Sequence, residues 1–248
     1  MINIASPVIE EEERRAVNEV IESGMLAQGP KVAELEESWA KYCGVKHALA
    51  VNSGTAAIHC ALYAAGVGEG DEVITTPYSF IATINPILML GARPVLVDID
   101  EETFNIDVSK IEAAITDKTK AIIPVDLYGQ PCDWKELREI ADKHELKIIE
   151  DACQAIGAEY DGVKTGALGD FGCFSLYATK NIMCGEGGVV TTNSDDAAAA
   201  IRSFRQHGMT SSYEYADLGY NYRMSDLHGA IAVEQLKKVE DFTNRLIC

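Results

Sequence analysis

The sequence has few positive charges and no long apolar run. Its 21 lysines and arginines stand against 39 aspartates and glutamates, which gives a formal net charge of -18. Such an acidic chain is poorly suited to general binding of nucleic acid or of an anionic membrane surface. The first residues have neither the basic start nor the apolar stretch of a signal peptide, and no apolar run is long enough to cross a bilayer. We therefore expect neither nucleic acid nor membrane as a partner.

The cysteines are scattered without any C-x-x-C pair. There are seven, at positions 43, 60, 132, 153, 173, 184 and 248. This spacing indicates neither a zinc site nor a disulfide framework. The sequence thus predicts no metal and a reducing, cytoplasmic location.

Short apolar runs alternate with longer segments of helical period, and there is no repeat or linker. With 248 residues and 47% apolar composition the chain can bury a large core. Several runs are apolar on both alternating faces, as expected where helices cover a mostly parallel sheet. The pattern predicts a three-layer α/β/α fold. We expect strands at 47–52, 72–75, 94–97, 121–125, 146–149, 172–175 and 188–191, and helices at 9–23, 31–43, 54–65, 80–90, 107–115, 133–144, 195–207 and 225–246.

Ligands of such sheets gather at the carboxyl ends of the strands, so the residues that follow each strand are the candidates for a site. Ser53, Gly54 and Thr55 follow the first strand and open a helix, whose free N–H groups and dipole suit an anion. The same three residues are also an ordinary helix N-cap sequence. A phosphate site is therefore one of two interpretations.

Two further candidates are an acid and a lysine. Asp151 follows the strand at 146–149, where a carboxylate can pair with a protonated pyridine nitrogen. Taken alone, it is equally a helix cap or a metal ligand. Lys180 lies between two strands, and as a neutral amine it can attack an aldehyde. Most lysines are solvated surface charges, but Lys180 lies in an apolar, glycine-rich stretch and not on a charged helix face.

Together these pieces resemble the DegT/DnrJ/EryC1/StrS sugar-nucleotide aminotransferases, which use pyridoxal 5'-phosphate (PLP) and have the aspartate-aminotransferase fold type. The resemblance runs in order along nearly the whole chain. It rests on residues 26–30, 52–57, 76–83, 94–98, 150–155, 175–188 and 219–224. It implies that the chain is the large PLP-binding domain of such an enzyme.

The resemblance also implies a role for each candidate residue. Lys180 would hold PLP as a Schiff base and serve as the acid and base of the proton shift, and Asp151 would pair with the pyridine nitrogen. Phe80 would stack on the ring, although a plain core aromatic is the alternative, and Gln154 would lie near the phenolic oxygen. The expected phosphate cup consists of Ser53, Gly54, Thr55 and Ser175.

In the family an asparagine at the position of Asn221 reaches the phosphate of the neighbouring subunit. The resemblance therefore implies a homodimer with shared active sites. The alternative is that Asn221 is a polar loop residue. Family members usually continue into a smaller C-terminal domain, so we expect residues 1–248 to be the large domain with its N-terminal segment, without that small domain.

The implied activity is transfer of an amino group from glutamate to a keto sugar on a nucleoside diphosphate. One alternative is a truncated, non-catalytic scaffold that binds PLP or has a regulatory role. The sugar dehydratases of the family carry histidine in place of the lysine, which disfavours that branch. A nucleotide-binding oxidoreductase is disfavoured because no G-x-G-x-x-G follows a predicted strand.

Other charged residues receive weaker interpretations. His59 lies in an apolar helix and His144 ends a charged one, so both are expected to be structural. Arg202, Arg205 and His207 are expected nearer the mouth of the site, where a positive group can meet a substrate diphosphate.

Overall fold

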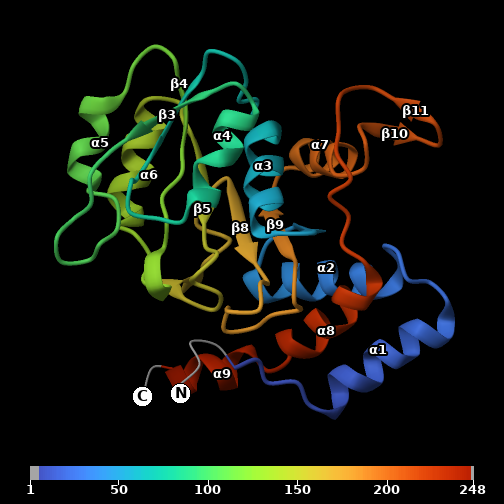
Figure 1. Ribbon diagram of the computed structural model, residues 1–248. Helices are drawn as coiled ribbons and strands as arrows, with labels where there is room; N and C mark the ends of the chain where they lie inside the picture. Colours follow the sequence, from blue (N-terminus) through green and yellow to red (C-terminus); the bar gives the residue numbers. More distant parts are fainter. Residues whose placement is uncertain (1–5, 247–248) are drawn as a thin grey trace.

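The structure is a computed structural model that describes residues 6–246. Within these residues the centre is a seven-stranded sheet in the order β1-β9-β8-β5-β4-β2-β3 (Figure 1). The strands are β1 (His47–Val51), β2 (Glu72–Thr75), β3 (Arg93–Leu96), β4 (Thr119–Ile122), β5 (Lys147–Asp151), β8 (Phe171–Ser175) and β9 (Gly188–Thr192). All neighbouring pairs are parallel except those of β9, which runs antiparallel to β1 and β8. The expected mostly parallel sheet is confirmed.

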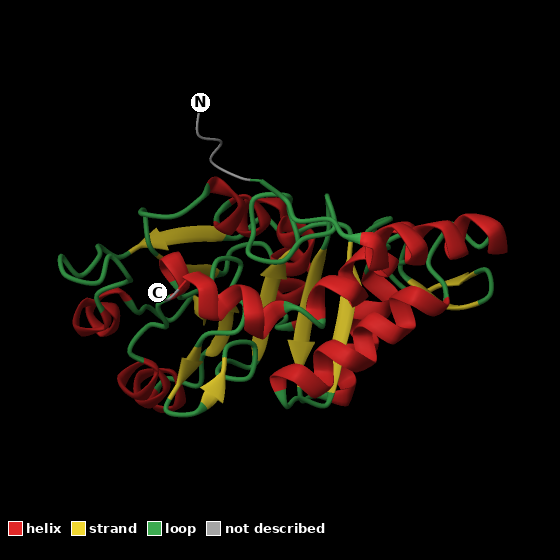
Figure 2. Cartoon of the chain, turned by 90° about the horizontal axis from the view of Figure 1, so that it is seen from below, coloured by secondary structure: helices red, strands yellow, loops and turns green. Residues whose placement is uncertain are grey.

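Helices cover both faces of this sheet (Figure 2). One face packs against α3 (Gly54–Ala64), α4 (Asn85–Met89) and α7 (Asp195–Phe204). The other packs against α2 (Pro30–Cys43), α5 (Val108–Ala114), α6 (Trp134–Lys143) and α8 (Asp226–Leu236). Consecutive strand residues point to opposite faces, so Ile149 joins the core under α3 whereas Ile148 joins the core under α5 and α6. The three-layer expectation is confirmed.

Two expected helices are divided. The 80–90 segment is a 3-10 turn, η1 (Ile81–Thr83), followed by α4, because Pro86 suits the first turn of a new helix. The 225–246 segment consists of α8 and α9 (Val239–Leu246), which are separated at Lys237 and Lys238. The strand expected at 121–125 begins two residues earlier and ends at Ile122.

Smaller elements lie outside the main sheet. Two antiparallel hairpins occur, β6 (Glu159–Tyr160) with β7 (Val163–Lys164), and β10 (Met209–Ser211) with β11 (Glu214–Tyr215). The turn η2 (Leu127–Gly129) follows β4. The β10–β11 hairpin stands apart from the sheet (Figure 1). No helix in the described part of the chain is long and apolar enough to span a membrane.

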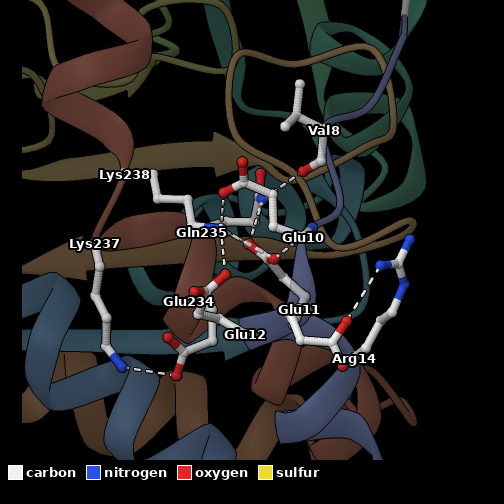
Figure 3. A network of polar contacts seen from close by, with 10 residues as sticks. Val8, Glu10, Glu11, Glu12, Arg14, Glu234, Gln235, Lys237 and Lys238 are labelled. Carbon is white, nitrogen blue, oxygen red and sulfur yellow. Dashed lines mark hydrogen bonds and ion pairs between the residues drawn. The ribbon is translucent and has the colours of Figure 1, made fainter.

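The first helix, α1 (Glu11–Ser23), is fixed to α8 and to the turn that follows it by a polar network (Figure 3). Glu13 is buried, and its carboxylate accepts hydrogen bonds from the amide of Gln235 at 2.8 Å and from the ammonium of Lys238 at 2.8 Å. Lys238 also pairs with Glu10 at 2.7 Å. A buried carboxylate is stable here because each of its oxygens has a donor.

A single carboxylate joins α8 to the start of α2. Asp226 is buried and accepts hydrogen bonds from the backbone N–H groups of Gly29, Lys31 and Val32 at 2.7, 3.1 and 3.0 Å. These are donors of a helix start, which have no partner inside the helix. A Cβ on Gly29 would lie 2.8 Å from Asp226 Oδ2, so only glycine permits this approach.

We therefore expect Asp226→Ala to lower the free energy of unfolding by about 2–3 kcal/mol, because buried backbone donors lose a charged acceptor. Asp226→Asn keeps one acceptor oxygen and should lose about half as much. Urea unfolding followed by circular dichroism measures both. Equal losses for the two variants, or a change below about 0.5 kcal/mol for alanine, would contradict the role given to this carboxylate.

Candidate active site

A cavity of about 1480 Å³ lies at the carboxyl ends of the parallel strands. It brings together eight of the nine candidate residues, from segments that follow β1, β2, β5 and β8. They are Ser53, Gly54, Thr55, Phe80, Asp151, Gln154, Ser175 and Lys180. This is the place where a parallel sheet holds its ligands.

The corner made by α3 and β8 depends on a glycine. A Cβ on Gly54 would lie 2.8 Å from the Cβ of Ser175 and 3.1 Å from the Sγ of Cys153, so no larger residue fits. Ser53 caps α3, with its Oγ accepting the N–H of Ala56 at 3.1 Å. The N–H groups of Gly54 and Thr55 belong to the first turn, where no carbonyl of the helix reaches them. The corner is therefore suited to a phosphate.

Asp151, at the end of β5, is a buried carboxylate with hydrogen bonds but without a cation. Its Oδ2 accepts the hydroxyl of Thr83 at 2.8 Å, and its Oδ1 accepts the N–H of Cys153 at 3.2 Å. The Thr83 hydroxyl is also 2.9 Å from the hydroxyl of Ser79. In residues 6–246 no lysine, arginine or histidine forms an ion pair with Asp151. A buried carboxylate in this state favours a positively charged ligand, such as a protonated ring nitrogen.

Lys180 is half-buried in the loop between β8 and β9, and its backbone N–H donates to the carbonyl of Tyr177 at 2.9 Å. No carboxylate of the described residues forms an ion pair with it. Lys180, Cys153 and Asp151 line the same cavity. Desolvation raises the pKa of the Cys153 thiol well above its usual value, so this thiol is protonated and a poor nucleophile at neutral pH.

Gln154 is oriented by a strained turn. Its Oε1 accepts the backbone N–H of Tyr128 at 3.3 Å, so the NH₂ group is left to meet an acceptor in the cavity. Tyr128 has a φ of 54°, in the left-handed region that non-glycine residues seldom occupy. Such strain is typical of residues that serve a site.

Among the lining residues that were not candidates from the sequence, several make polar contacts that shape the site: Ser79, Thr83, Tyr128 and Asn181. Thr83 and Ser79 lie within the 76–83 segment that carried the resemblance, but the contact of Thr83 with Asp151 is long-range. Tyr128 follows β4, so the rule for strand ends applied to it as well. The side-chain amide of Asn181 donates to the carbonyl of Ile156 at 3.0 Å and fixes the lysine loop.

Phe80 and Asn221 lie at different places relative to the cavity. Phe80 lines it and is 71% exposed, so the core-aromatic alternative is wrong. Asn221 is exposed and does not line the cavity. Its carbonyl accepts the side-chain amide of Asn52 at 3.3 Å, which places it just before the α3 corner.

The expectation for Arg205 is wrong. Its side chain is buried, donates to the carbonyl of Ala50 at 2.6 Å and pairs with Glu36, so it stabilises the fold instead of facing a substrate. Arg202 and His207 do not line the cavity.

The two histidines expected to be structural have structural contacts. His59 is buried beside the Tyr222 hydroxyl, at 3.0 Å, and burial lowers its pKa to about 4, so it is neutral at pH 7. His144 lies 2.9 Å from Glu112.

Residues 7–246 match the model of the DegT/DnrJ/EryC1/StrS aminotransferase family. The chain belongs to this family. It is 47% identical over 243 residues to the GDP-perosamine synthase of Caulobacter vibrioides, covering 97% of this chain and 66% of that protein. The chain spans about two thirds of the length of the curated relatives that it matches.

Solved structures of the family share the fold. DesV of S. venezuelae superposes with a TM-score of 0.90 and 39% identity, over 93% of this chain and 62% of that one. The putative sugar aminotransferase Spr1654 of Streptococcus pneumoniae, in its PMP form, gives a TM-score of 0.94 and 30% identity, over 99% and 69% of the two chains. The expected aminotransferase-like α/β fold is therefore confirmed.

Enzymes of this family use PLP, and the cavity fits each part of that cofactor. The α3 corner suits the phosphate. Within the described part of the chain, the Asp151 carboxylate lacks a positive partner and Lys180 is an amine without an ion pair. These three groups face one cavity. The residues present are therefore compatible with PLP.

We expect Thr83→Val to weaken PLP binding about tenfold, because a hydrogen bond to a charged group contributes about 1.5–3 kcal/mol. Valine has the shape of threonine but cannot donate to Asp151. Thr83→Ser, which keeps the hydroxyl, is the matched control and should bind within about twofold of the unchanged protein. Titration of PLP by visible absorption measures both. Equal affinities for the valine and serine variants would show that the hydroxyl does not hold the carboxylate.

Proposed function

We propose that this chain is a PLP-dependent aminotransferase that moves an amino group from glutamate to a keto sugar carried on a nucleoside diphosphate. The observation that carries the proposal is that Lys180 and Asp151 lie in one cavity with the start of α3, and that neither has an ion-pair partner among residues 6–246. The likeness to GDP-perosamine synthase supports a nucleotide-sugar substrate. Lys180 stands where the sugar dehydratases of the family carry histidine, and it therefore supports amino transfer over dehydration.

Each residue has one task in this proposal. When bound, PLP supplies an electron sink that stabilises negative charge on a substrate carbon. Lys180 would hold the cofactor and serve as the acid and base of the proton shift, and Asp151 would pair with the ring nitrogen. Phe80 would stack on the ring, and Gln154 would lie near its phenolic oxygen. Ser53, Gly54, Thr55 and Ser175 would hold the phosphate.

The proposal includes a homodimer with shared sites. Asn221 lies outside the cavity of its own chain yet beside Asn52, at the start of the segment that leads into α3. Large apolar side chains at Tyr78, Phe80 and Ile81 are also exposed near the cavity. A second copy that covers this rim would bring its own Asn221 to the phosphate. The six cysteines of the described residues are free thiols, which supports a reducing compartment such as the cytoplasm.

The experiment that tests the function is the visible absorption spectrum of the purified chain with PLP, before and after excess glutamate. We expect a yellow band that glutamate bleaches. Lys180→Ala should form no such band and should slow amino transfer about 10²–10⁴-fold, the usual contribution of a positioned acid and base.

Lys135→Ala is the matched control, because Lys135 is exposed on α6 and lies outside the cavity. It should leave the band and its bleaching unchanged. A band that forms but does not respond to glutamate would indicate a PLP-binding scaffold in place of a transaminase. Absence of a band in the unchanged chain would contradict both the transaminase and the PLP-binding scaffold.

A further inference from the structure

Two carboxyl groups that the proposed reaction does not use lie together beneath the cavity. Asp126 and Glu150 are both fully buried, at 0% exposure, and the backbone N–H of Asp126 donates to the carbonyl of Asp151, the residue next to Glu150, at 3.1 Å. Each of the two carboxyls acts on the pKa of the other. Asp126 precedes η2, the turn that contains Tyr128, and Glu150 precedes Asp151 in β5. No ion pair to either carboxyl occurs in residues 6–246. Two ionised carboxylates in such a place would repel each other strongly, so the pair retains a proton.

The hydrogen bonds show which oxygen carries this proton. Both oxygens of Glu150 accept backbone N–H groups, Oε1 from Gly166 at 2.6 Å and Oε2 from Leu168 at 3.3 Å. Asp126 Oδ1 accepts the N–H of Cys132 at 2.8 Å and the indole N–H of Trp134 at 3.3 Å. Asp126 Oδ2 is buried and has no donor among the residues that the structure describes. It is the oxygen left to hold a hydrogen and donate it to Glu150.

We propose that Asp126 and Glu150 share one proton, carried on Asp126 Oδ2, and that this pair positions the Asp151 and Tyr128 segments of the cofactor site. The inference rests on the proposed function insofar as the site binds PLP. Both residues act through their neighbours and are positioning residues.

Backbone contacts connect the pair to the site. The N–H of Asp126 donates to the carbonyl of Asp151 at 3.1 Å, and the N–H of Asp151 donates to the carbonyl of Pro124 at 3.0 Å. Two residues beyond Asp126, the N–H of Tyr128 holds Gln154. If the two carboxyls separate, the turn therefore moves away from β5 and releases the groups that orient Asp151 and Gln154.

The other titratable groups that face the pair stay neutral near pH 7. They are three thiols: Cys132 lies in the segment before α6, Cys43 in α2 and Cys173 in β8. Burial raises the pKa of all three, that of Cys43 to about 12. The neighbouring carboxylate of Asp151 has its own two donors. The shared proton is thus the titrating group of this cluster around neutral pH.

The direction of the pH dependence follows from burial. Burial raises the pKa of both carboxyls above the usual value, that of Asp126 to about 7. The stability that it contributes is full below an ordinary carboxyl pKa of about 4 and is lost as pH rises through the raised value. Loss of the proton leaves two buried charges in contact, which loosens the site.

Two amide variants test the position of the proton. In Asp126→Asn the Oδ1 still accepts from Cys132 and Trp134, and an amide N–H replaces the O–H. We expect PLP affinity at pH 7 within about threefold of the unchanged chain. In Glu150→Gln the NH₂ group meets the N–H of Gly166 or Leu168, two donors in contact, so PLP affinity should fall about tenfold or more and the unfolding temperature should drop.

The measurements are PLP affinity and, without PLP, thermal unfolding, each from about pH 6 to about pH 9. As pH rises, the PLP affinity and the unfolding temperature of Asp126→Asn should both increase relative to those of the unchanged chain, because its amide has no proton to lose. Asp142→Asn, on the exposed side of α6, is the matched control and should follow the unchanged chain.

Identical pH profiles for Asp126→Asn and the unchanged chain, or better tolerance of Glu150→Gln than of Asp126→Asn, would overturn the proposal. Different unfolding profiles with identical PLP profiles would overturn the positioning role. Failure of every protein to bind PLP would overturn the proposed function and the positioning role with it, and the unfolding profiles would still decide where the proton lies.

Discussion

The carboxylate of Asp151 is the charge around which the candidate site is arranged. Removing a carboxylate from water costs several kcal/mol unless hydrogen bonds or a cation compensate. Here two donors, Thr83 from the segment after β2 and the N–H of Cys153, compensate in part, and no cation does so within the described residues. The remaining cost is offset when a positive ligand arrives. Such a carboxylate is stable enough to fold and still favours a protonated ring nitrogen.

The close packing of α3 against the sheet is the second requirement. Gly54 contacts the end of β8, and a Cβ on Gly188 would collide with the carbonyl of Ser53. Because β9 runs antiparallel to β8, the loop that contains Lys180 leaves the sheet at Ser175 and returns at Gly188 beside the same helix start. The reversed strand therefore brings the amine and the anion-binding N–H groups into one cavity. Glycine at both positions is what lets the two backbones meet.

Much of this arrangement is readable from the sequence because it depends on local order. The strands that precede Ser53, Asp151 and Lys180 are short apolar runs, and parallel pairing brings their ends to one edge of the sheet. The Thr83 contact is not readable, since it joins residues 68 positions apart. Tyr128 was missed although it follows a strand, because its role lies in its backbone N–H.

The errors have physical causes as well. Arg205 reads as a surface charge, yet its guanidinium satisfies the carbonyl of Ala50 inside the fold. The break between α8 and α9 could not be predicted, because no glycine or proline lies at residues 237–238. The β6–β7 turn did have a sequence signal, Asp161-Gly162, and both residues have positive φ, as a two-residue hairpin requires.

The acidity of the chain conflicts with an anionic ligand only at long range. A net charge of -18 repels phosphate, but salt screens exposed charges over about 8 Å at physiological ionic strength. Groups that touch the phosphate act within about 3 Å, where the first N–H groups of a helix point directly at it. Proximity therefore outweighs net charge at the α3 corner. Because a carboxylate there would be as close as the donors, the corner can bind an anion only while its own residues, Ser53, Gly54, Thr55 and Ser175, are uncharged, as they are.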